Sequence, residues 1–166
     1  MALDLIAVES KEVTDRLHGL GFRDVFAEKD GVLSRLDDEN PFEINAYSGD
    51  DYEFVIQKGK ADAVADMEKK GFLLNKGLCH KMKENRMFVI FKFSNLIESE
   101  NFFKTYKNLL INGKLCNEYS VPCIYVSYAK DIYEIKSPAQ LVAFAGEFGY
   151  NYKNLSESWD KLLQRG

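Results

Sequence analysis

The stretch KKGFLLNKGLCHKMKENRMFVIFKF, residues 69–93, decides how the middle of the chain is expected to fold. From residue 78 onward, apolar and polar side chains alternate, which is typical of β-strands with one buried face. With Glu84-Asn85 as the turn, residues 78–93 pair as a β-hairpin. A shift of the register by one residue would bury lysines, so the pattern specifies the register.

The predicted hairpin has one apolar face and one face that mixes cations with an aromatic ring. Residues 69–93 contain seven basic residues and one acidic residue, whereas the rest of the chain contains 15 basic and 25 acidic residues. Cations around an exposed aromatic ring are typical of single-stranded nucleic-acid binding, because the ring stacks on bases while the cations contact phosphates. The candidate binding residues are Lys81, Lys83, Arg86, Phe88 and Lys92.

The segment RMFVIFKF, residues 86–93, resembles the RNA-recognition-motif consensus at Arg86, Phe88 and Phe93. This resemblance implies a sheet whose aromatic side chains stack on RNA bases. Met87 and Val89 stand where that motif has small residues or glycine, and the order of elements differs. The chain is therefore not assigned to that family.

Outward from this stretch, the pattern predicts an α+β fold with a mostly antiparallel sheet built from hairpins, helices packed on one face and two C-terminal helices. Helices are predicted up to about Leu20 and over residues 60–70 and 95–112. Strands are predicted over residues 22–36 around an Asp30-Gly31 turn, and over 42–46, 52–57, 72–75, 121–129 and 133–135.

Several helix ends can be placed from short signals. Three amphipathic segments end at a glycine that an aromatic residue follows at once, namely Gly21, Gly71 and Gly149. A glycine there can adopt the left-handed conformation that closes the last turn. SPAQ, residues 137–140, predicts a helix start with a capping box, since Ser137 caps, Pro138 follows and Gln140 can reach back.

The length of 166 residues favours one α+β domain over residues 1–166, with a possible C-terminal helical layer over 137–166. Three cysteines without paired spacing argue against a disulfide framework and favour a reducing compartment. The opening MALDLIAV is too short for a signal peptide, and no apolar run approaches the roughly 18 residues of a membrane span. A cytoplasmic protein without a membrane partner is expected.

No cofactor or metal is expected. Cys79 and His80 are neighbours, but on a strand their side chains would point to opposite faces. Asp131, Glu134 and Lys136 in AKDIYEIKS resemble the carboxylate-and-lysine core of restriction-type nucleases, which implies Mg²⁺-dependent hydrolysis. Only two residues separate the two acids, so an exposed charged edge is the favoured interpretation.

Because no catalytic motif is found, the first interpretation is a non-catalytic protein-binding or regulatory domain, such as an adaptor, inhibitor or accessory factor of bacteria or phages. Its partner would be another protein or a second copy of the chain. One alternative is a nucleic-acid-binding protein that uses the basic hairpin 78–93. Another is a metal-dependent nuclease-like or small-ligand enzyme, so three classes stay open.

Overall fold

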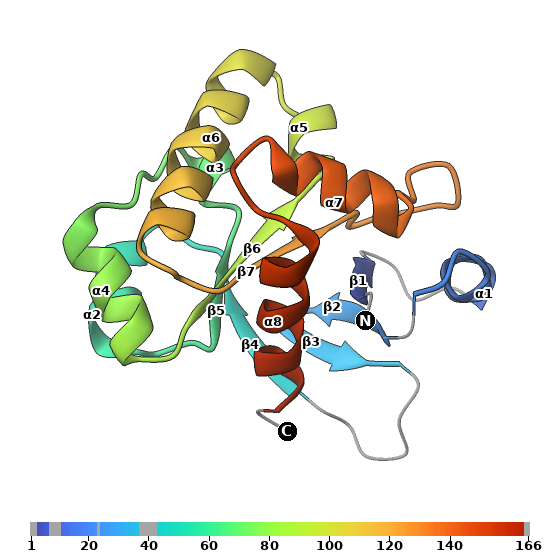
Figure 1. The fold of residues 1–166 in the computed structure, drawn as a ribbon, viewed down its shortest axis with the longest axis horizontal. Coiled ribbons are helices and arrows are strands. Elements are labelled where there is room, and N and C mark those ends of the chain that lie inside the picture. Colours follow the sequence, from blue (N-terminus) through green and yellow to red (C-terminus); the bar gives the residue numbers. More distant parts are fainter. Residues whose placement is uncertain (1–2, 7–10, 23, 37–42, 165–166) are drawn as a thin grey trace.

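The computed structural model describes residues 3–6, 11–22, 24–36 and 43–164, and its ribbon is drawn in Figure 1. The strands are β1 (Leu3–Ile6), β2 (Asp24–Lys29), β3 (Val32–Arg35), β4 (Glu43–Tyr47), β5 (Ala63–Ala65), β6 (Phe88–Lys92) and β7 (Cys123–Val126). The helices are α1 (Lys11–Gly19), α2 (Tyr52–Lys58), α3 (Met67–Lys70), α4 (Lys76–Glu84), α5 (Ser94–Ile97), α6 (Phe102–Glu118), α7 (Pro138–Gly146) and α8 (Tyr152–Leu163).

The described strands form one mixed sheet in the order β1-β2-β3-β4-β5-β6-β7. The β2–β3 and β3–β4 pairs are antiparallel, whereas β1–β2, β4–β5, β5–β6 and β6–β7 are parallel. Each parallel pair from β4 onward is connected by helical segments, as parallel pairing requires. The prediction of a mostly antiparallel sheet built from hairpins is therefore wrong.

The sheet is curled into a half-barrel with helices on both of its faces. Its concave face is apolar, and α8 covers it: Leu162 shares one small cavity with side chains of β2, β3, β4, β6 and β7. On the convex face, Tyr125 of β7 stacks on Phe148 with the ring centroids 5.7 Å apart. Figure 1 shows α8 lying across the strands, with α1 at one end of the molecule and α2 and α4 at the other. The expectation that helices pack on one face only is thus also wrong.

A buried carboxylate links the first strand to the end of the last. Asp4 of β1 is fully buried and accepts hydrogen bonds from the backbone N–H of Ser127 (2.6 Å) and from its hydroxyl (2.5 Å). Ser127 directly follows β7. The two edges of the curled sheet therefore meet at this contact.

Five segments differ from the predicted elements. Residues 52–57 form the helix α2 and not a strand, because Tyr52, Val55 and Ile56 share one buried helical face. Residues 60–70 contain β5 and the short α3 in place of one helix. Residues 76–84 form the helix α4, so the predicted hairpin over 78–93 is wrong, and neither 72–75 nor 133–135 is a strand.

The predicted caps and the predicted turn are confirmed. Gly21, Gly71 and Gly149 have φ values of 92°, 77° and 89°, and Ser137 forms the capping box with Gln140. The Asp30-Gly31 turn joins β2 to β3 with φ of 52° and 79°, which is the positive-φ pair that a tight hairpin prefers. Phe42, the first residue of the predicted strand 42–46, lies outside the described residues. No helix among the described residues is long and apolar enough to cross a membrane.

Candidate nucleic-acid interface

The structure divides the five predicted binding residues between different places. Lys81 and Lys83 are exposed on α4, and Arg86 lies in the turn between α4 and β6. Phe88, at the start of β6, is only 2% exposed. Lys92, at the other end of that strand, is also 2% exposed. The five side chains therefore do not form the single exposed face that the hairpin implied.

Three of the five residues come together at the amino ends of β6 and β7. Lys83, Arg86 and Phe88 line a cavity of about 370 Å³ together with Ser120, Pro122, Lys161 and Gln164. Phe88 forms part of its apolar wall, and the cations come from α4, the α4–β6 turn and α8. We call this cavity the basic groove. The described residues that line it carry three positive charges and no negative charge.

Local structure fixes the turn that carries Arg86. Asn75 caps the start of α4 by accepting a hydrogen bond from Leu78 N–H at 3.0 Å. At the other end, the Asn85 side-chain amide donates to Ile56 O at 2.7 Å, which ties α4 to α2. Arg86 then adopts a φ of 54°. This left-handed residue directs the chain into β6 and places its side chain at the groove.

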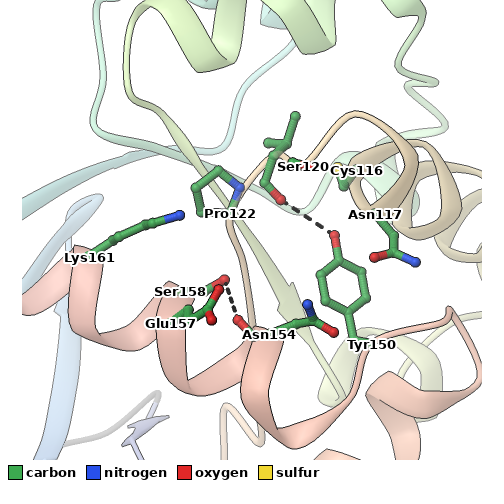
Figure 2. A pocket seen from close by; sticks show the side chains of 10 residues that line it. Cys116, Asn117, Ser120, Pro122, Tyr150, Asn154, Glu157, Ser158 and Lys161 are labelled. Atoms are coloured by element: carbon green, nitrogen blue, oxygen red, sulfur yellow. Dashed lines mark hydrogen bonds between the residues drawn. The ribbon is translucent and has the colours of Figure 1, made fainter.

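A second, smaller cavity adjoins the basic groove and shares Ser120, Pro122 and Lys161 with it. We call it the inner pocket, and it has a volume of about 130 Å³. Figure 2 shows that its side chains come from the end of α6, the α6–β7 turn and one face of α8. They are Cys116, Asn117, Ser120, Val121, Pro122, Tyr150, Asn154, Glu157, Ser158 and Lys161.

The wall of the inner pocket is held by hydrogen bonds. The Tyr150 hydroxyl donates to Val121 O at 3.4 Å and lies 3.1 Å from Cys123 Sγ, and burial raises the pKa of this hydroxyl. A capping box between Asn151 and Asn154 fixes the first turn of α8. The inner pocket is consequently built on packed elements, with Asn154 oriented by its role in the cap.

Two lysines of the groove, Lys83 and Lys161, are not neutralised by described carboxylates. In the part of the chain that the structure describes, neither Lys83 nor Lys161 forms an ion pair. Lys81 pairs with Glu84 at 2.6 Å and points toward a separate hollow between α2 and α4. Anions that enter the groove therefore meet two lysines that no described carboxylate neutralises.

Lys92 belongs to a different site, at the carboxyl ends of the strands. Its Nζ lies 2.8 Å from Glu28 Oε2 and 3.2 Å from Asp66 Oδ2, and it also lies over the Tyr128 ring at 3.9 Å. Asn95 donates to Asp66 at 2.7 Å and to Glu68 at 2.8 Å. The carboxyl-end network is the name used below for Glu28, Asp66, Glu68, Lys92, Asn95 and Tyr128.

In the carboxyl-end network, burial and neighbouring charge shift the pKa values of the carboxyl groups in opposite directions. Burial alone would raise the pKa of Asp66, but the charge of Lys92 and the hydrogen bonds from Asn95 and Ser48 lower it. For Glu68, burial dominates and raises the pKa to about 7. Among the described residues, no group of His, Cys, Asp and Glu is arranged to hold a metal ion. Lys92 is therefore paired with Glu28 and Asp66 inside the protein and lies outside the basic groove.

The residues that resemble a nuclease core form a turn. Asp131 accepts hydrogen bonds from the backbone N–H groups of Tyr133 (2.8 Å) and Glu134 (3.2 Å). The Glu134 carboxylate accepts from Lys130 N–H at 2.8 Å, and Lys136 Nζ donates to Glu134 O at 3.1 Å. Both carboxylates therefore serve the backbone of one turn, and they do not lie on adjacent strands as that chemistry requires.

Four residues of the groove were missed by sequence reasoning, namely Ser120, Pro122, Lys161 and Gln164. They come from the α6–β7 turn and from the C-terminal end of α8. No local pattern marks them, because they meet Lys83 and Arg86 only through the packing of α8 on the curled sheet. Lys161, Ser120 and Gln164 nonetheless supply a cation, a hydroxyl and an amide, which are donors that proteins use toward phosphate oxygens.

Comparisons with known proteins find a likeness of fold. No family model and no curated protein matches the chain. Its structure is similar to a chain of the cryo-EM structure of archaeal ribonuclease P with mature tRNA, with a TM-score of 0.71 and 15% sequence identity. The match covers 96% of this chain and 89% of that chain.

This likeness overturns the interpretation of the chain as a protein-binding regulatory or inhibitory domain. The matched chain belongs to a structure that contains tRNA. At 15% identity the likeness extends to the fold and not to particular residues. The residues that would bind must therefore come from this chain's own geometry.

Proposed function

We propose that this protein binds RNA as a component of a ribonucleoprotein particle, and that the basic groove contacts the phosphate backbone. The observation that carries the proposal is the convergence of Lys83, Arg86 and Lys161 on one groove without an acidic residue among its described lining. The likeness of fold to a chain of a tRNA-containing assembly supports it. Sequence analysis grouped Lys81 and Phe88 with these cations. Lys81 would lie beside the contact, and Phe88 would support the wall of the groove.

The acidic composition of the whole chain limits the size of the contact. The formal net charge is −4, so phosphate would be attracted to the groove and repelled elsewhere. Three phosphate contacts predict that log affinity for single-stranded RNA falls with log salt with a slope of about −2, since each contact contributes about −0.7. A weak, salt-sensitive interaction that other components of a particle reinforce is the expected behaviour. A protein partner and a cytoplasmic location stay predictions.

The test measures binding of a fluorescent tRNA transcript by anisotropy across a series of salt concentrations. Lys83→Glu and Lys161→Glu should each weaken binding and make the salt slope shallower by about 0.7, the share of one contact. Lys104→Glu and Lys107→Glu are matched controls, because both are exposed lysines on α6 away from the groove and make the same change of charge. Equal losses in the groove variants and the controls would contradict the proposal, as would the absence of any binding by the parent protein.

A further inference from the structure

The inner pocket has the size of a single aromatic ring. Its volume is about 130 Å³, and cavities of roughly 150 Å³ in proteins bind benzene. It opens where it shares Ser120, Pro122 and Lys161 with the basic groove. A nucleotide whose phosphate lies in the groove would therefore have its base at the mouth of the inner pocket.

Its lining offers donors and acceptors on one side. Asn154 Oδ1 accepts from Asn151 N–H at 3.2 Å, which leaves the side-chain amide of Asn154 as a donor. Ser158 Oγ donates to Asn154 O at 3.0 Å, so its oxygen remains an acceptor. Glu157 adds a carboxylate that lies 3.9 Å from Lys153 Nζ, at the limit of an ion pair. Figure 2 shows Asn154, Glu157 and Ser158 together on the face of α8 toward the inner pocket.

Two rings in the lining of the inner pocket are suited to contact a flat ring. Pro122 stands between the two cavities, and the buried Tyr150 ring forms part of the wall. A paired base could not reach this position, because its hydrogen-bonding edge is already used and its ring lies within the duplex stack. Bases that proteins read by this edge are unpaired.

We propose that the groove and the inner pocket together bind an unpaired nucleotide of RNA, with its phosphate on Lys83, Arg86 and Lys161 and its base inside the pocket. This inference rests on the proposed function and adds the class of RNA that it takes. The Glu157 carboxylate accepts a hydrogen bond from an exocyclic amino group of the base. Cytosine, which carries such a group, therefore binds better than uracil, whose carbonyl oxygen would face the carboxylate.

The experiment compares fluorescent oligo(C), oligo(U) and a fully paired RNA duplex of equal charge per strand. We expect oligo(C) to bind at least 5-fold more tightly than oligo(U), since a good polar contact to a base edge discriminates by roughly 1 kcal/mol or more. Glu157→Gln should bring the two affinities together, because its amide can donate to the uracil oxygen. Glu100→Gln removes the same charge from an exposed site between α5 and α6 and should leave the ratio unchanged.

The outcomes separate this inference from the proposed function. If the protein binds the duplex as tightly as the single strands, and Glu157→Gln leaves the oligo(C) to oligo(U) ratio unchanged, the unpaired-nucleotide inference is wrong while RNA binding stands. If none of the three RNAs binds at low salt, both proposals fail. A second variant, Asn154→Asp, keeps the oxygen that accepts from Asn151 N–H and removes the amide donor from the pocket. It should weaken oligo(C) binding without a loss of folding, and unchanged oligo(C) binding would count against the pocket.

Discussion

Arg86 and Ser120 occupy the same position in two successive helix–strand turns, and each has a φ of 54°. In both turns the backbone N–H of the left-handed residue donates a hydrogen bond to the carbonyl three residues earlier. The N–H of the following residue donates to the carbonyl five residues earlier, from Met87 to Met82 and from Val121 to Cys116, both at 2.8 Å. Glycine normally occupies this cap position, because other residues are strained there. Both exceptions line the basic groove, as expected where side chains serve a site at some cost in stability.

Ser120→Gly should therefore stabilise the protein. Relief of the left-handed strain is worth 1–2 kcal/mol, and the greater freedom of glycine in the unfolded chain offsets part of it, so the free energy of unfolding should rise by roughly 1 kcal/mol. Urea denaturation measures the change. Ser120→Ala keeps the strain and should produce no such gain; an equal gain in both variants would show that the backbone conformation is not the cause.

Glu68→Gln should change how stability depends on pH. The Glu68 carboxyl is buried, with Oε2 lacking a hydrogen-bond partner in the described structure, and burial raises its pKa from 4.5 to about 7. Between these values the unfolded chain has released the proton and the folded protein has kept it, so rising pH favours unfolding. The wild type should lose up to about 3 kcal/mol between pH 4.5 and pH 7 through this group.

The glutamine variant lacks this titration, since its amide occupies the place of the protonated carboxyl. Relative to the wild type, Glu68→Gln should gain stability as the pH rises from 5 to 8, which urea denaturation at the two pH values measures. Asp66 and Lys92 are present in both proteins, so the comparison isolates the effect of removing the Glu68 carboxyl. A constant difference between the two proteins at all pH values would contradict the pKa assigned to Glu68.

Lys92→Met should be strongly destabilising. It removes the cation between Glu28 and Asp66, whose carboxylates would remain close together and largely buried. Loss of one partner from a buried ion pair typically costs about 3–5 kcal/mol. Combining it with Asp66→Asn should recover part of the loss, because one of the uncompensated charges is then gone. Lys69→Met, on the exposed side of α3, is the control and should change the free energy of unfolding little.

Asn112→Ala should destabilise the segment that leads into α4. The fully buried Asn112 side chain accepts from Leu74 N–H at 2.8 Å and donates to Phe72 O at 2.9 Å. Its removal leaves two backbone groups without partners, which costs about 1–3 kcal/mol for each that stays buried. Hydrogen exchange of the Leu74 amide should report the local opening. Asn117→Ala removes one exposed side-chain bond and should cost less than 1 kcal/mol.

Helix caps were the most predictable part of the fold. The choice between a helix and a strand from hydrophobic periodicity was the least predictable. Gly21 and Ser137 could be placed because their signals are local, and they stay the same whatever packs against them. In α4, by contrast, Leu78 and Met82 fit both the strand period of two and the helix spacing of four. Asn75 before α4 and Asp51 before α2 are N-caps that would have favoured helices.

The site was only half predictable for the same reason. Lys83 and Arg86 are close in sequence, so any local structure keeps them near one another. Lys161 reaches the groove only because α8 crosses the concave face of the sheet, and that placement depends on parallel strand pairing that no short pattern encodes. Phe88 follows the rule that parallel strands are buried on both faces. Its side chain therefore forms part of the groove wall and is not exposed at the surface.

The contact between Asp4 and Ser127 spans 123 positions of the chain. Closing so large a loop is costly in entropy and is rewarded only when both edges of the sheet exist. We expect such a contact to be absent from the transition state for folding, and interactions of that kind slow unfolding without speeding folding. On this expectation, the Asp4–Ser127 contact affects how long the folded state survives more than how quickly it is reached.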